Sequence, residues 1–176
     1  MVQLIGTEFE DFNALDIAGN EVSRSGVFQR PVGFIGFANR KTGNTMNEII
    51  LNVFGHYLDR ASFVQFMDVT TVPELLRKLP GIALKHEYKT LSRKLSENAP
   101  GNNKNADLDA VKDRFFMVPD WQGEFVYKYI PKDKMDTIHL LLIDKNHVIK
   151  HYIDEYTPGS RDSLRAKIEE MLKEEG

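Results

Sequence analysis

The chain has 176 residues, of which 41% are hydrophobic and 28% are charged, and its net charge is −3. This length suits one domain with a full core, and the slight negative charge argues against a nucleic-acid-binding face, which needs clustered lysine and arginine. The chain has no cysteine, which excludes disulfides, thiolate nucleophiles and cysteine-ligated zinc or iron–sulfur sites.

The sequence indicates no membrane span, because no apolar run approaches the roughly 20 residues that cross a bilayer. The stretch 1–12 contains three acidic residues and no basic segment, so it does not resemble a signal peptide. A signal already cut from a mature chain would leave no trace in this sequence.

The first predicted elements are a small β-hairpin, a buried strand and a helix. A turn signal at 18–20 indicates the hairpin within 9–22. The apolar run 32–38 predicts a core strand, and a short polar turn follows it. Apolar residues at spacings of three and four then predict an amphipathic helix over 44–58.

The middle of the chain is predicted to hold one strand and two helices. The alternating stretch 62–69 predicts the strand, and Pro73 opens a short helix that is expected to end at Pro80. A second, more polar helix is expected over 82–95, and 98–107 has the composition of a loop.

The last third predicts a short strand at 115–118, a second core strand at 137–143 and its antiparallel partner at 147–153. A terminal helix is expected over 161–174. Strands that alternate with helices predict an α/β fold whose mixed sheet is covered on both faces.

Three blocks of this sequence resemble the thioredoxin superfamily, in its redoxin (AhpC-TSA-type) branch. They are the opening block 12–22, the strand–turn–helix unit 34–48 and the hairpin 142–149, in which His147 stands where the family usually has glycine. The resemblance implies a thioredoxin-like fold, with a mixed central sheet, helices on both faces and an N-terminal β-hairpin. It also implies a single domain over 1–176, with a helical and loop insertion at about 72–114.

The departures from the family pattern concern its active site. The two cysteines of the family motif fall on Thr42 and Thr45, and the cis-proline falls near Thr137 or Ile138, where no proline stands. A threonine hydroxyl stays protonated and cannot form a mixed disulfide. We therefore expect a protein without thiol–disulfide activity or a cofactor, acting as a binding or scaffold module rather than as an enzyme.

Two segments, 38–42 and 116–121, are most similar to the YtfJ family of exported bacterial proteins, which also lacks the cysteine pair. If this narrower resemblance holds, we expect an exported or periplasmic protein whose signal peptide was removed. Otherwise, we expect a cytoplasmic protein.

The turn before the first helix carries the positions of the lost active site, Thr42, Gly43, Asn44 and Thr45. One interpretation is a helix cap, in which Thr42 or Asn44 accepts from helix N–H groups. A second is a vestigial site for an anion, because Arg40 and Lys41 stand beside the positive helix end. A third is a hydroxyl that orients glutathione, and it makes a glutathione-dependent or other non-thiol enzyme the alternative function.

Polar residues near other strand ends are the remaining candidates. Asp68, Asp120, Asp136 and Asp144 could share a cleft at the carboxyl ends of the strands, or could serve turns, which aspartate favours. Trp121 is either a partner anchor or a lid on the core. The candidate contacts for an unknown protein or a small anionic ligand are Arg40, Lys41, Asp120, Trp121, Thr137 and Ile138.

We expect no metal site, because none of the five histidines lies in an H-E-x-x-H motif. If residues 145–146 form a two-residue turn, position 139 pairs with 152 and position 140 pairs with 151. His139 and His151 then face opposite sides of the sheet and cannot share a metal.

Overall fold

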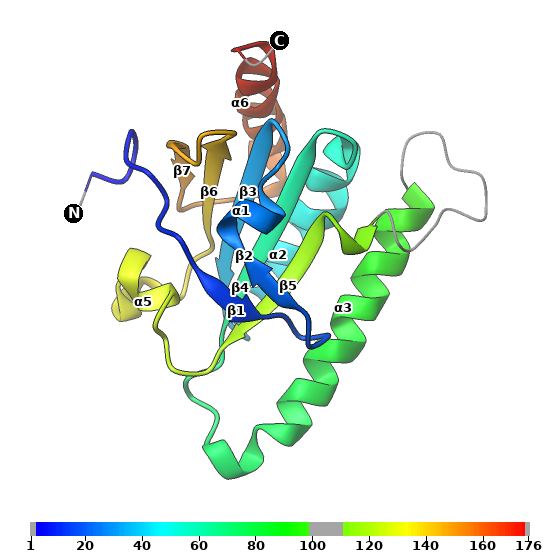
Figure 1. Ribbon diagram of the computed structural model, residues 1–176, viewed down its shortest axis with the longest axis vertical. Helices are drawn as coiled ribbons and strands as arrows, with labels where there is room; N and C mark the ends of the chain where they lie inside the picture. Colours follow the sequence, from blue (N-terminus) through cyan, green and yellow to red (C-terminus); the bar gives the residue numbers. More distant parts are fainter. Residues whose placement is uncertain (1–2, 99–110, 175–176) are drawn as a thin grey trace.

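The computed structural model describes residues 3–98 and 111–174 (Figure 1). Its centre is a five-stranded sheet with the order β5-β4-β3-β6-β7. β3 pairs parallel with β4, and β4 pairs parallel with β5, whereas β6 pairs antiparallel with β3 and with β7. The predicted mixed sheet is therefore confirmed, and its strands are β3 (Val32–Ala38), β4 (Ala61–Asp68), β5 (Phe115–Asp120), β6 (His139–Asp144) and β7 (Ile149–Ile153).

The predicted N-terminal hairpin is present as β1 (Asn13–Leu15) and β2 (Glu21–Ser23). The Asp16 carboxylate holds its turn by accepting from the N–H groups of Ala18 (2.9 Å) and Asn20 (2.8 Å). The hairpin lies against β5, because the N–H of Ile17 donates to the carbonyl of Met117 at 2.8 Å.

Helices cover both faces of the central sheet, as predicted. One core cluster joins β3, β4 and β6 to the longer helices, and the other joins the same strands to the hairpin and the short helical turns. Figure 1 shows α1 and the hairpin in front of the sheet and α2 behind it. Every residue of β3 is buried, as expected for a strand covered on both faces. The helices are α1 (Arg24–Val27), α2 (Gly43–Asn52), α3 (Lys78–Asn98), α5 (Val126–Tyr129) and α6 (Arg161–Glu174).

Short 3₁₀ turns connect these elements. The structure corrects two of the predicted helices, and the first correction involves one of these turns. The helix predicted over 44–58 ends at Asn52, and η1 (Phe54–Tyr57) follows as a separate turn. Val53 lies at the junction, and its β-branched side chain and the following Gly55 both disfavour a continued helix. The other turns are η2 (Glu74–Leu76), η3 (Lys132–Lys134) and η4 (Pro158–Ser160).

The second correction concerns Pro80, which was expected to end a short helix. Instead, α3 runs through Pro80 from Lys78 to Asn98 as one helix of 21 residues. Pro80 is the third residue of this helix, in the first turn, where N–H groups have no partner within the helix and its missing N–H does no harm. The loop predicted at 98–107 lies almost wholly outside the described residues.

The turn between β6 and β7 differs from the predicted two-residue turn. His147 has φ +64°, in the left-handed region, and its N–H donates to the Asp144 carbonyl at 2.9 Å. Leu142 therefore pairs with His151, and a register shift follows beside it. This geometry explains why glycine is usual at position 147. His139 and His151 still face opposite sides of the sheet, as predicted.

Both edges of the central sheet have neighbours. At the β7 edge, Gly6 donates its N–H to the Ile149 carbonyl, and Phe9 donates to the His147 carbonyl, each at 2.8 Å. At the other edge, β5 contains Pro119, which has no N–H to donate. Within the described residues, no helix has the length and apolar character that a bilayer crossing requires.

Candidate functional site

The predicted site residues lie near the carboxyl edge of the sheet, where β3, β4 and β5 end and β6 begins. There the turn before α2 is closed by reciprocal hydrogen bonds between Asn39 and Thr42. Asn39 Oδ1 accepts from the N–H groups of Lys41 (2.8 Å) and Thr42 (3.2 Å), and Thr42 Oγ1 accepts from the N–H of Asn39 (3.0 Å). This is a capping-box arrangement. The N–H of Gly43 also stays within the turn, donating to the Asn39 carbonyl at 2.9 Å.

The cap interpretation named Thr42 or Asn44, and it was wrong for the side chain of Thr42. Its side chain makes no cap hydrogen bond to the helix, and the residue is only 5% exposed. The residue that caps the turn is Asn39, because its carbonyl accepts from the N–H of Gly43 and its side chain accepts from the N–H groups of Lys41 and Thr42. Asn44 is exposed and Thr45 is half-buried. A Cβ at Gly43 would meet nothing within 4 Å, so the turn has no steric need for glycine there.

The segment before β6 lies across the N-terminus of α2 and contacts the turn through a hydrogen bond and an ion pair. Asn39 Nδ2 donates to the Met135 carbonyl at 2.7 Å, and Lys41 Nζ pairs with Asp136 at 2.8 Å. Both side chains of this ion pair are 71% exposed, so it contributes less than about 1 kcal/mol to stability. Arg40, beside them, is exposed. Arg40 and Lys41, the two cations predicted for an anion site, therefore lie at the N-terminus of α2.

Thr137 and Ile138, where the resemblance places the cis-proline, lead into β6. Thr137 is exposed, Ile138 is packed in the core, and none of the described peptide bonds is cis. The next residue, His139, is buried, and its Nε2 lies 2.8 Å from the carbonyl of Lys134. This contact assigns the proton to Nε2, so Nδ1 accepts from the Tyr152 hydroxyl at 2.6 Å.

Asp120, the last residue of β5, is a structural residue rather than an open ligand contact. Its buried carboxylate accepts four backbone hydrogen bonds, at 2.8–3.1 Å, from the N–H groups of 123–126. These bonds fold the chain back from β5 into α5. Trp121, next in the chain, is half-buried against the core and stacks with Arg77 at 5.3 Å.

The four aspartates predicted near strand ends do not share a cleft. Asp68 accepts from the Tyr127 hydroxyl at 2.9 Å and from the Thr70 hydroxyl at 2.8 Å. Burial, together with the Asp68 carboxylate, raises the pKa of the Tyr127 phenol. Asp144 lies at the opposite end of the sheet, beside Val32. The turn interpretation describes Asp68, Asp120 and Asp144, whose carboxylates accept from backbone N–H groups of the turns that follow them.

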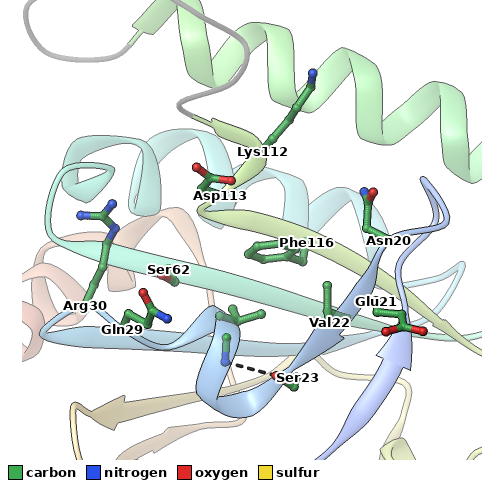
Figure 2. A pocket seen from close by; sticks show the side chains of 12 residues that line it. Asn20, Glu21, Val22, Ser23, Gln29, Arg30, Ser62, Lys112, Asp113 and Phe116 are labelled. Atoms are coloured by element: carbon green, nitrogen blue, oxygen red, sulfur yellow. Dashed lines mark hydrogen bonds between the residues drawn. The ribbon is translucent and has the colours of Figure 1, made fainter.

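A cavity of about 820 Å³ lies at that opposite end, near the start of β4 and beside β2 and α1 (Figure 2). Its wall carries charges of both signs, Glu21 and Asp113 against Arg30 and Lys112. Ser62, also in the wall, is 1% exposed, and its hydroxyl has no hydrogen-bond partner among the described residues. The sequence patterns did not single out these residues, because they come from three separate segments of polar loop and strand.

No cluster of three histidine, cysteine or acidic side chains suited to a metal occurs within 3–98 and 111–174. The polar groups at the carboxyl edge are engaged mainly with the protein's own backbone. Asn39, which the sequence interpretation missed, could have been found from its residue type, since asparagine is a favoured helix-capping residue.

Comparison with known proteins identifies the fold. No family model and no curated protein matches the chain. Among solved structures, a candidate protein disulfide isomerase from Bacteroides thetaiotaomicron superposes with a TM-score of 0.62 at 20% identity, over 96% of this chain and 90% of that chain. A candidate thiol:disulfide interchange protein, DsbE, from Chlorobium tepidum gives a TM-score of 0.60 at 16% identity, over 96% and 97%. The fold is thioredoxin-like.

A peroxiredoxin structure superposes on the chain as well. The yeast mitochondrial 1-Cys peroxiredoxin gives a TM-score of 0.59 at 13% identity, over 99% of this chain and 79% of that chain. The likeness confirms the thioredoxin-like resemblance drawn from the three sequence blocks, and at these identities it shows the fold alone. The narrower resemblance to the YtfJ family stays a prediction.

Proposed function

We propose that this thioredoxin-like protein is a non-redox binding or scaffold module, which recognises a protein or a small anionic ligand over the turn 39–45. The observation that supports this most directly is chemical: threonine stands at both positions where the fold's redox enzymes need sulfur. The fold and the lack of cysteine are compatible with a lack of thiol redox activity. In addition, the hydroxyl of Thr42 is used inside the turn.

The surface around the closed turn has features suited to recognition. Arg40 and Lys41 are exposed beside the first turn of α2, where the helix dipole also favours negative charge. The ion pair of Lys41 with Asp136 is solvent-exposed and weak, so an acidic ligand can replace Asp136 at little cost. Hydrogen bonds from Asn39 hold this surface in place.

The alternative, a glutathione-dependent or other non-thiol enzyme at Thr42, has less support. A catalytic hydroxyl must reach the substrate and needs an activating base. Thr42 is 5% exposed, and its hydroxyl oxygen contacts the N–H of Asn39 at 3.0 Å and the side-chain oxygen of the same residue at 3.3 Å. Asn39 is an amide and cannot serve as a general base.

Two assays test the lack of redox activity. Purified protein should reduce insulin disulfides and consume peroxide only at the background rate, with a cysteine-containing thioredoxin as the positive control for the first assay and a peroxiredoxin for the second. Turnover above background in either assay would refute the proposal.

A thermal-shift series separates the binding module from the alternative enzyme. Glutathione should leave the melting temperature of the wild type unchanged. A shift of several degrees that disappears in Thr42→Val and Thr45→Val would favour the enzyme. Pull-down with wild type and with Arg40→Glu/Lys41→Glu as bait then identifies partners that need the two cations, and an identical set of captured proteins would contradict recognition at this turn.

A further inference from the structure

Four large apolar side chains are exposed at η2 and the start of α3, and we call them the apolar tip. Leu75 is 96% exposed, Leu76 58%, Leu79 71% and Ile82 58%. Further along α3 the apolar residues are buried in the core, so the exposure is confined to the first turns and the preceding η2. Figure 1 shows this end of the helix as the lowest point of the molecule, beyond the end of the sheet.

The apolar tip is a formed structure and is anchored to the domain. The N–H of Leu76 donates to the Pro73 carbonyl at 2.8 Å, and the N–H of Gly81 donates to the Arg77 carbonyl at 3.0 Å. The Arg77 guanidinium lies 5.3 Å from the centre of the Trp121 ring, a cation–π contact that ties the tip to the end of β5. Trp121, the only tryptophan in the sequence, therefore contacts the tip through Arg77.

Basic residues line the helix beside the tip. Lys78, Lys85 and Lys89 are spaced by seven and four residues, so they lie along one side of α3, next to Ile82. All three are exposed, and none forms an ion pair with another described residue. Residues 74–98 contain six Lys and Arg against three Glu, a net charge of +3 in a chain whose total is −3.

We propose that the apolar tip docks on an anionic lipid surface. A convex apolar tip enters the boundary between headgroups and acyl chains without a matching groove, and the adjacent lysines lie at the level of the negative headgroups. A second copy of the chain is disfavoured as the occupant, because two segments of charge +3 would face each other. The inference uses none of the residues of the turn 39–45 and does not depend on the proposed function.

Vesicle co-sedimentation tests the proposal with the whole chain. Phosphatidylcholine vesicles that contain about one third phosphatidylglycerol should bind the protein, and phosphatidylcholine alone should bind it weakly. Salt at about 0.5 M should release most of the bound protein, because screening shortens the reach of the lysines. Equal binding to both vesicle types, or to neither, would overturn the proposal.

Two variants with matched controls locate the contact. Leu75→Ser/Leu79→Ser should abolish binding, while Leu15→Ser, which removes a side chain 60% exposed on the hairpin, should not change it. All these side chains are exposed, so the variants should keep the melting temperature of the wild type.

The charge variant removes Lys78, Lys85 and Lys89 together, each replaced by glutamine. Each lysine near an anionic surface contributes about fivefold to the partition coefficient, so the triple variant should bind about 100-fold more weakly. The control carries the same loss of charge elsewhere, at Lys134, Lys167 and Lys173, and should bind like the wild type. An equal loss of vesicle binding in both triple variants would show that the net charge of the whole chain controls binding, and would contradict a contact at α3. A dimer in sedimentation velocity that Leu75→Ser/Leu79→Ser dissociates, without vesicle binding, would assign the tip to a protein interface instead.

Discussion

The two ends of the central sheet use buried polar groups in opposite ways. At the carboxyl edge, the Thr42 hydroxyl and the Asp120 carboxylate are buried and fully engaged with backbone N–H groups. At the other end, the Ser62 hydroxyl is equally buried but has no partner among the described residues, and a cavity of about 820 Å³ lies beside it. The comparison teaches that a buried polar residue at a strand end can belong to the framework of the fold, and that its hydrogen bonds show whether it does.

The largest expected effect tests the claim that Asp120 belongs to the framework. Asp120→Ala leaves four backbone N–H groups without their acceptor, and we expect a loss of about 3–4 kcal/mol in the free energy of unfolding. Urea denaturation measures it. Asp136→Ala is the matched control, because that carboxylate is exposed and should cost less than about 1 kcal/mol. Similar losses of stability in Asp120→Ala and Asp136→Ala would contradict the claim that Asp120 belongs to the framework.

The next effect concerns the closed turn. Asn39→Ala removes the acceptor of two N–H groups and the donor to the Met135 carbonyl, so unfolding should become about 2 kcal/mol easier. Hydrogen exchange should speed up at 41–43 before it changes in the strands. Unchanged protection of these amides would show that the cap is not what holds the turn.

A pair of hydroxyl deletions compares the two ends directly. Thr42→Val leaves the N–H of Asn39 without its acceptor and should lower the free energy of unfolding by about 1.5 kcal/mol. Ser62→Ala removes a buried hydroxyl that has no partner among the described residues, so we expect no loss of stability and an unchanged melting temperature. The comparison fails if Ser62→Ala destabilises the protein as much as Thr42→Val does.

The smallest effect concerns the turn at the cavity end. His147 adopts φ +64°, which glycine reaches without steric cost, so His147→Gly should stabilise the protein by about 1 kcal/mol. A gain in melting temperature measured by calorimetry checks this. Asn146→Gly is the control, because that residue has no positive φ and should gain nothing. A loss of stability in His147→Gly would mean that the contact of its ring with Phe28 outweighs the strain.

The sequence was sufficient to predict those strands and helices whose residue patterns lie within one short stretch of the chain. The apolar run 32–38 and the helical spacing after it appear as β3 and α2, and the alternation of strands and helices predicted the α/β class. The register of β7 could not be predicted, because it depends on one dihedral angle, at His147. The role of Asp120 was equally hidden, since its donors are backbone groups brought to it only when the chain folds back at 123–126.

The arrangement at the edges of the sheet has a consequence for the proposed binding role. Residues 6–9 already occupy main-chain groups of the β7 turn, and Ile17 occupies one on β5, where Pro119 also interrupts the row of donors. An incoming extended segment would find few main-chain positions free to extend the sheet. Under the proposed binding role, specificity would then come from side chains, so exchanging a few surface residues should redirect the protein to a new partner without rebuilding its backbone.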